Sequence, residues 1–113
     1  MANNFLLYGA YGYTGRLIAE RAREQGLRPI LAGRSAEKTR QAAEELEMEY
    51  RVFSLDNPDA VDDGLEGVSV VLHAAGPFVH TARPMIEACL RKGVHYLDIT
   101  GEIAVFELAA AIG

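Results

Sequence analysis

The sequence of 113 residues has a single cysteine, no long apolar segment and no excess of positive charge. The lone Cys89 excludes an internal disulfide, which fits a reducing cytoplasm. No segment approaches the roughly 20 apolar residues of a membrane span, and the N-terminus has too little charge and apolar length for a signal peptide. The net charge of −5, without a basic stripe, argues against binding to nucleic acid, whose backbone requires many lysine and arginine contacts.

Several catalytic motifs are also missing. His73, His80 and His95 are scattered and accompany no CxxC pair or HExxH motif, so no metal site is expected. His73 is expected in the core or in a site wall, because it falls within a predicted strand. The absence of GxxxxGK[ST] excludes a nucleoside triphosphatase P-loop. No tyrosine is followed four residues later by lysine, so the Tyr-x-x-x-Lys pair of short-chain dehydrogenases is missing.

The charges that are present are unevenly distributed. Residues 1–40 carry seven basic and three acidic side chains, a net of +4, whereas the other 73 residues carry four basic and thirteen acidic ones, a net of −9. A local positive excess near the N-terminus suits a small polyanion.

Five short apolar runs alternate with helical stretches and predict one α/β domain spanning residues 1–113. The expected fold is a Rossmann-type, doubly wound parallel sheet of about five strands in the order 3-2-1-4-5, with helices on both faces. Strands are expected at residues 4–8, 28–33, 49–54, 68–74 and 95–99. The fourth is β-branched and apolar, which is typical of a central strand buried on both faces.

Helices are expected at residues 16–25, 36–47 and 58–65, and in a stretch that ends before Gly93. Gly26 is a natural stop for the first helix and Ser35 a natural N-cap for the second, while Pro84 is placed in the first turn of the fourth. Residues 102–112 form an Ala-rich amphipathic stretch at the chain end. It either closes the domain or marks a truncated longer protein. We expect truncation, because a two-mononucleotide fold normally has a sixth strand. An apolar helix at the end also suggests a homo-oligomer.

The strongest local signal is the glycine loop after the first strand. Gly9 permits a tight turn, Gly12 lets the backbone approach a pyrophosphate, and Gly15 allows the following helix to pack closely. The backbone N–H groups of Tyr13 and Thr14 would then point at phosphate oxygens. The Thr14 hydroxyl is either an additional donor or only a helix-start residue. The spacing GxxGxxG is looser than GxGxxG, and a plain strand–turn–helix corner is the alternative.

A second signal follows the second strand. Arg34 stands nineteen positions after Gly15, where an acidic residue would bind the ribose hydroxyl of NAD. Its guanidinium can take the 2′-phosphate of NADP bidentately, assisted by the Ser35 hydroxyl and by Lys38. NADP is therefore expected in preference to NAD. Alternatively, Arg34 is merely solvated and Ser35 only a cap.

Two further segments complete the expected site. Asp56, after the third strand, is placed for the adenine edge or else belongs to an acidic surface loop. Small residues at the end of the fourth strand either let the cofactor riboses lie against backbone or form a buried turn. The expected cofactor-binding residues are Gly9, Ala10, Tyr11, Gly12, Tyr13, Thr14, Gly15, Gly33, Arg34, Ser35, Lys38, Asp56, Ala74, Ala75, Gly76 and Pro77.

Four segments together (residues 9–16, 31–34, 75–78 and 95–102) resemble the saccharopine dehydrogenase-like family, in particular the branch with the trans-acting enoyl reductases. The resemblance implies an N-terminal NAD(P)-binding domain, normally followed by a substrate domain that this chain lacks. It also implies hydride transfer to or from a nicotinamide cofactor, with residues 76–78 and 100–102 near the nicotinamide. One departure is His73-Ala74, where many relatives are expected to have an Asn-containing pair.

These observations support a first hypothesis: an NADP-binding domain of an oxidoreductase that acts on a small-molecule or lipid-type substrate and is inactive alone. His80 and Glu102 are the ionisable residues near the expected nicotinamide end, but a loop histidine and a helix-start glutamate explain them adequately. No catalytic residue is therefore assigned. The second hypothesis is a non-catalytic module that binds NAD(P) and senses redox state. A third, a complete short-chain-type epimerase or reductase, is disfavoured by the missing Tyr/Lys pair.

Overall fold

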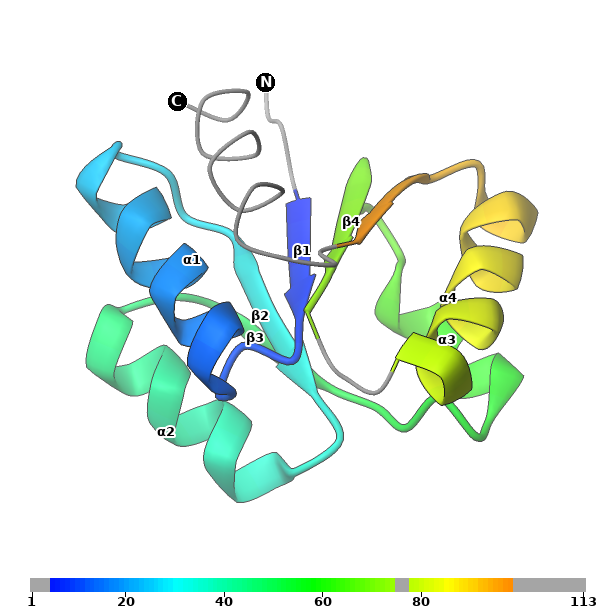
Figure 1. Ribbon diagram of the computed structural model, residues 1–113, viewed down its shortest axis with the longest axis horizontal. Helices are drawn as coiled ribbons and strands as arrows, with labels where there is room; N and C mark the ends of the chain where they lie inside the picture. Colours follow the sequence, from blue (N-terminus) through cyan, green and yellow to red (C-terminus); the bar gives the residue numbers. More distant parts are fainter. Residues whose placement is uncertain (1–4, 75–77, 99–113) are drawn as a thin grey trace.

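The computed structural model describes residues 5–74 and 78–98, with the backbone alone described for residues 78–82 and 98. Strands and helices alternate along the chain (Figure 1): β1 (Phe5–Tyr8), α1 (Tyr13–Glu24), β2 (Ile30–Gly33), α2 (Ala36–Leu46), β3 (Tyr50–Val52), α3 (Pro58–Gly64), β4 (Val70–His73), α4 (Phe78–Lys92) and β5 (His95–Asp98). All four strand pairs are parallel, and the strand order is β3-β2-β1-β4-β5. The predicted Rossmann-type topology is thereby confirmed.

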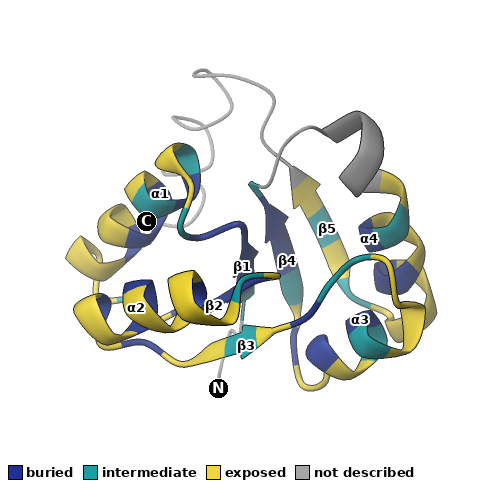
Figure 2. Ribbon diagram, turned by 90° about the horizontal axis from the view of Figure 1, so that it is seen from below, coloured by how far each residue is buried: buried dark blue, intermediate teal, exposed yellow. Residues whose placement is uncertain are grey.

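The sheet buries both faces because its central strands are apolar on both sides. In β1, Leu6 and Tyr8 join the core on the side of α3 and α4, whereas Leu7 joins the core on the side of α1 and α2. Figure 2 shows the buried strands between these two helix pairs. Leu6 and Leu7 are fully buried, and each such side chain contributes about 1.5–3 kcal/mol relative to an exposed one. The central strands therefore form a rigid support for the loops at their ends.

An aromatic group lies at the carboxyl ends of the central strands. The Tyr8 hydroxyl donates to the Phe53 carbonyl oxygen at 2.8 Å. The Tyr8 ring stacks on His73 with centroids 5.8 Å apart, and His73 has no exposed surface. His73 is thus a core residue beneath the carboxyl edge of the sheet, one of the two positions expected for it.

Three helices end in the same way, with a residue at positive φ followed by a backbone bond back to the last turn. Gly26 (φ 82°) and Gly93 (φ 69°) occupy this position after α1 and α4, and Glu47 (φ 59°) occupies it after α2. In each case the next residue donates its N–H to a carbonyl five residues earlier, as Met48 does to Ala43 at 2.9 Å. This is the Schellman arrangement, for which glycine is usual because a Cβ is strained there. Helix α2 therefore ends one residue before the predicted Glu47.

The placement of Pro84 was predicted wrongly. It lies inside α4, which begins six residues earlier, at Phe78. Proline has no N–H for the preceding turn and usually begins or interrupts a helix. Here the buried stripe of Met85, Ala88 and Cys89 packs against the sheet, and this packing holds the helix through the proline.

The remaining differences concern element boundaries. Helix α1 begins at Tyr13, three residues before the predicted start, and β2 begins after the buried Pro29. The amphipathic stretch predicted at residues 102–112 lies outside the described residues. Within the described part, no helix is long and apolar enough to cross a lipid bilayer.

Candidate functional site

The carboxyl edge of the sheet places several loops next to one another. Strands β1 and β4 are neighbours, yet the chain leads from β1 to β2 on one side and from β4 to β5 on the other. Such a point of divergence is where open α/β sheets bind ligands. The loop after β1 and the β2–α2 corner (residues 33–39) meet here, since Gly9 donates its N–H to the Ala32 carbonyl oxygen at 2.8 Å.

The three loop glycines are required for different reasons. Gly9 has a φ of 89°, which L side chains rarely adopt. A Cβ on Gly15 would collide with the Gly9 carbonyl oxygen and come within 2.9 Å of the Ala10 Cα, so the helix could not pack against the loop. Gly12 has an ordinary φ of −76°, and among the described residues a Cβ there would meet only the Gly9 carbonyl oxygen, at 3.6 Å. The fold itself therefore gives no reason for glycine at position 12, and its exposed surface is open to a ligand.

The start of α1 differs from the starts of α2 and α3. Ser35 caps α2 by accepting the N–H of Lys38 at 3.3 Å, and Asn57 caps α3 by accepting the N–H of Asp59 at 3.1 Å. Both of these first turns also contain an acidic residue. Helix α1 has Gly12 at its N-cap, with no side-chain cap and no acidic residue in the first turn.

Consequently, the first N–H groups of α1 have no acceptor of their own helix and no capping side chain. They belong to Tyr13, Thr14 and Gly15, and a helix start carries a partial positive charge. The Tyr13 ring does not pack over them, because it is 88% exposed. This helix start can accept an anion.

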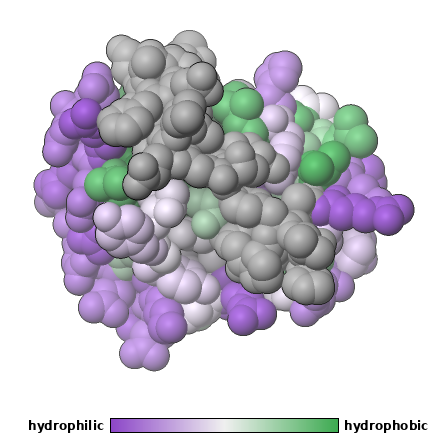
Figure 3. Space-filling model, in the orientation of Figure 1, coloured by the Kyte–Doolittle hydropathy of each residue, from purple (hydrophilic) through white to green (hydrophobic). Residues whose placement is uncertain are grey.

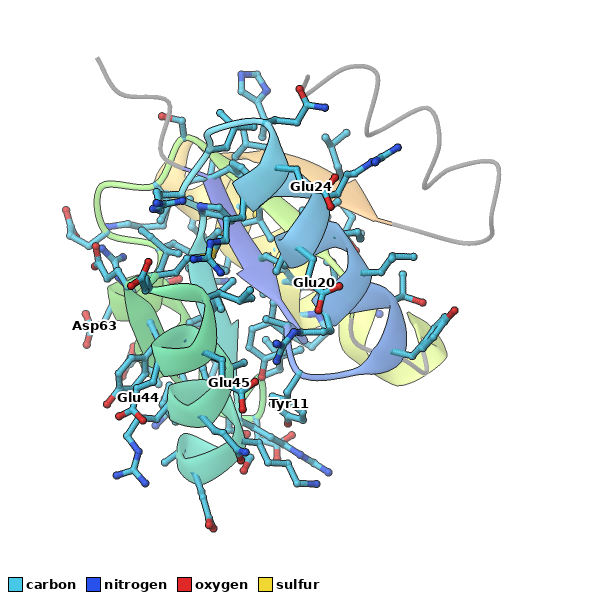
Figure 4. All side chains as sticks on the ribbon, turned by 90° about the vertical axis from the view of Figure 1, so that its left-hand side faces the viewer. Tyr11, Glu20, Glu24, Glu44, Glu45 and Asp63 are labelled. Carbon is cyan, nitrogen blue, oxygen red and sulfur yellow. The ribbon has the colours of Figure 1, made fainter. Side chains whose placement is uncertain are left out.

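Most of the positive charge in residues 1–40 is paired. Arg16, next to the glycine loop, bonds Glu20 at 3.0 Å and Glu45 at 2.7 Å, and these two carboxylates lie on α1 and α2 beside the loop (Figure 4). The hydrogen bond from Arg16 lowers the pKa of Glu45. Further pairs with glutamates are formed by Arg21, Arg23 and Arg40. The outer surfaces of α1 and α2 are accordingly hydrophilic (Figure 3).

Within the described residues, the cations at the carboxyl edge that form no ion pair are Arg34 and Lys38, both exposed. Arg34 lies within electrostatic reach of the Tyr8 hydroxyl. Burial raises the pKa of Tyr8 to about 12, with Tyr11 and Asp56 also raising it and Arg34 opposing them. The Tyr8 hydroxyl bonds the Phe53 carbonyl oxygen, and the Phe53 N–H donates to the Gly33 carbonyl oxygen at 3.1 Å, so the ends of β1, β2 and β3 lie next to one another. Of the seven basic side chains in residues 1–40, Arg28, Arg34 and Lys38 form no ion pair with the described residues, and the last two lie at this corner.

The β2–α2 corner also contains a contact that the sequence analysis missed. A Cβ on Gly33 would lie 2.6 Å from the Tyr11 Cε2 and 2.8 Å from the Thr39 Oγ1. The Tyr11 ring therefore lies over the end of β2, and the Lys38 Nζ lies 5.7 Å from the centre of that ring. Thr39 is fully buried, and its Oγ1 has no hydrogen-bond partner among the described residues. A glycine that ends a buried strand was the available signal for such a close contact.

The structure describes some of the other residues predicted to bind the cofactor and not others. Asp56 is exposed, and its backbone N–H donates to the Ser54 Oγ at 3.2 Å, so its role toward adenine stays a prediction. Ala74 is half-buried and donates to the Tyr8 carbonyl oxygen at 2.9 Å. Ala75, Gly76 and Pro77 lie outside the described residues.

Two other groups have no place in this site. Cys89 is buried in the core, and burial raises the pKa of its thiol to about 11. The described residues contain no cluster of three or more His, Cys, Asp or Glu side chains that could hold a metal ion.

Comparison with known proteins agrees with this geometry. Residues 5–111 match the family model of the saccharopine dehydrogenase NADP-binding domain. A trans-acting enoyl reductase of Mycobacterium leprae is 34% identical over 107 residues, which cover 88% of this chain and 26% of the relative. A saccharopine dehydrogenase-like oxidoreductase of Mus musculus is 32% identical over 127 residues, covering 96% of this chain and 30% of the relative. The chain therefore spans between a quarter and a third of the length of these relatives.

A solved structure shows the same fold. The Citrobacter sp. triphenylmethane reductase complexed with NADP(H) superposes with a TM-score of 0.74 at 20% identity, covering 96% of this chain and 46% of that one. From the family match, the chain belongs to the saccharopine dehydrogenase NADP-binding domain family and is a dinucleotide-binding domain.

Proposed function

We propose that this chain binds NADP in preference to NAD and forms the cofactor-binding part of an oxidoreductase. The diphosphate would lie on the start of α1 and on Gly12. The adenosine 2′-phosphate would lie at the β2–α2 corner against Arg34, Ser35 and Lys38. The observation that carries the proposal is that an uncapped helix start and two unpaired cations occupy one edge of the sheet. Family membership supports the same cofactor.

The residues of this chain would bind and orient the cofactor, whereas a bound nicotinamide supplies the hydride chemistry. Backbone N–H groups of α1 would form charge-assisted hydrogen bonds of about 1.5–3 kcal/mol each, compared with roughly 0.3–1 kcal/mol from the helix dipole alone. Several such bonds acting together are needed for useful affinity. The pair of anchoring points, one for the diphosphate and one for the adenosine, would fix the direction in which the nicotinamide extends.

The substrate would be handled by parts of a longer protein, because this chain spans only 26% and 30% of the two relatives above. Those relatives are an enoyl reductase and an oxidoreductase, which favours a redox reaction for the whole protein. The alternative of a non-catalytic sensing module is not favoured by any observation on the described residues.

Calorimetric titration of NADP and NAD against the wild-type chain and Arg34→Ala tests the proposal. We expect Arg34→Ala to weaken NADP about 10- to 150-fold, which corresponds to a charge-assisted bond of roughly 1.5–3 kcal/mol. NAD affinity should not change, because NAD has no 2′-phosphate.

The matched control is Arg28→Ala, since Arg28 is an exposed arginine before the opposite end of the same strand. It should leave both affinities unchanged. Equal losses for NADP and NAD, or no loss of NADP affinity in Arg34→Ala, would remove the 2′-phosphate role.

A further inference from the structure

We propose that Tyr11 is a positioning residue that holds Lys38 for the 2′-phosphate and thereby sets the preference for NADP over NAD. The inference rests on the proposed function. The inference goes beyond the proposed function by assigning selectivity to an aromatic ring that does not itself bind the phosphate. The ring acts through the ammonium group of Lys38.

The first step concerns where the Tyr11 ring lies. Tyr11 is part-buried against the core on the side of α1 and α2. Its ring edge occupies the place where residue 33 would have a Cβ, since that atom would lie only 2.6 Å from the Tyr11 Cε2. Gly33 is buried at the end of β2 and has no positive φ. Glycine is thus required at position 33 by the neighbouring side chains rather than by the backbone.

The second step is the position of the cation. The Lys38 Nζ lies 5.7 Å from the ring centre, within the range of about 6 Å for cation–π attraction. A solvent-exposed lysine otherwise samples many rotamers, and holding one of them costs side-chain entropy. The ring reduces this loss before the ligand arrives, because it already holds the ammonium group at the corner next to Arg34.

The third step is the coupling between the two halves of the site. Tyr11 belongs to the loop after β1, whereas Lys38 belongs to the first turn of α2, where its backbone N–H donates to the Ser35 Oγ at 3.3 Å. The ring therefore connects the loop proposed to bind the diphosphate with the corner proposed to bind the 2′-phosphate. Only NADP contacts both, so loss of the ring should affect NADP selectively.

Two substitutions at one position separate the cation–π contact from simple packing. Tyr11→Phe keeps the aromatic face, whereas Tyr11→Leu keeps apolar bulk without it. We expect Tyr11→Phe to bind NADP as the wild type does and Tyr11→Leu to bind it about two- to fivefold more weakly, the fold-change of a partly exposed cation–π pair. The ratio of NADP to NAD affinity should fall in Tyr11→Leu and keep its wild-type value in Tyr11→Phe.

A double-mutant cycle with Lys38→Met identifies the partner. If Tyr11 acts through Lys38, Tyr11→Leu has no further effect on NADP once Lys38 is replaced. Thr39→Val is the control for local packing, because it removes a buried hydroxyl at the same contact while keeping the side-chain volume. It should leave the ratio of NADP to NAD affinity unchanged.

The outcomes distinguish this inference from the proposed function. A wild-type chain without preference for NADP overturns the proposed function and the inference together. A preference that depends on Arg34 but not on Tyr11 overturns the inference alone. So do equal losses of NADP and NAD in Tyr11→Leu, additive losses in the cycle, or tighter NADP binding in Tyr11→Leu, which would mean that the ring obstructs the ligand.

Discussion

The starts of α1 and α2 lie at the same edge of the sheet, yet they are built in opposite ways. Helix α2 is capped by its own Ser35 and has Glu37 in its first turn, whereas α1 has Gly12 at its N-cap and neither feature. One helix start has a backbone N–H capped by its own side chain and presents side chains outward. The other leaves its backbone N–H groups available. The difference suggests a division of roles: backbone for the diphosphate that both nucleotides share, and side chains for the phosphate that only NADP has.

Among the variants that test this comparison, Gly15→Ala is expected to have the largest effect on stability and binding. The new Cβ would collide with backbone atoms of Gly9 and Ala10, which cannot move aside as a flexible side chain could. We expect the free energy of unfolding to fall by about 1–3 kcal/mol, as for other overpacked sites. Binding to both nucleotides should be lost. Urea unfolding and calorimetry measure the two effects. Wild-type stability would show that the loop and α1 do not pack as described.

Gly12→Ala tests the ligand-binding role of the same loop separately from its packing, because a Cβ has room at this position. Apart from its chain neighbours, the one described atom within 4 Å of this Cβ would be the Gly9 carbonyl oxygen, at 3.6 Å. The free energy of unfolding should change by less than about 1 kcal/mol, since the φ of −76° suits alanine. Affinities for NADP and NAD should fall by the same factor, because the added methyl group enters the proposed diphosphate position. Unchanged affinity for both nucleotides would contradict that position.

The smallest expected effect on nucleotide binding concerns the start of α2. Ser35→Ala removes the hydroxyl that accepts the Lys38 N–H at 3.3 Å. Loss of an N-cap typically reduces stability by about 1 kcal/mol, and this reduction should appear in urea unfolding. NAD affinity should not change. A variant as stable as the wild type would mean that α2 does not depend on its cap, and the contrast with α1 would lose its basis.

Much of the fold was predictable because its signals are local. The apolar runs that form β1, β2 and β4 are short and continuous, and the glycine turns and caps between them, such as Gly26 and Ser35, fixed the order of elements. The placement of Pro84 was not predictable from local preference, since the packing of Met85, Ala88 and Cys89 against the sheet outweighs the helix-breaking tendency of proline.

The site was predictable in its backbone and less so in its side chains. The separate reasons for Gly9 and Gly15 follow from the strand–loop–helix pattern, and the structure confirms both. The pairing of Arg16 with Glu45 joins residues 29 positions apart, and the contact of Tyr11 with Gly33 joins two consecutive β–α units. The first contact arises from the way α1 and α2 pack side by side, which no pattern along the chain reveals; for the second, the glycine at the end of the buried β2 was the one local signal.

The most direct test of the division of roles is an NMR titration of the ¹⁵N-labelled chain with NADP and, separately, with NAD. With NADP, we expect amide shifts both at the start of α1, for Gly12, Tyr13 and Thr14, and at the start of α2, for Ser35 and Lys38. With NAD, we expect the α1 shifts to remain and the α2 shifts to be much smaller. Shifts at α2 that are equal for the two nucleotides, or no shifts at α1 with either, would contradict the account.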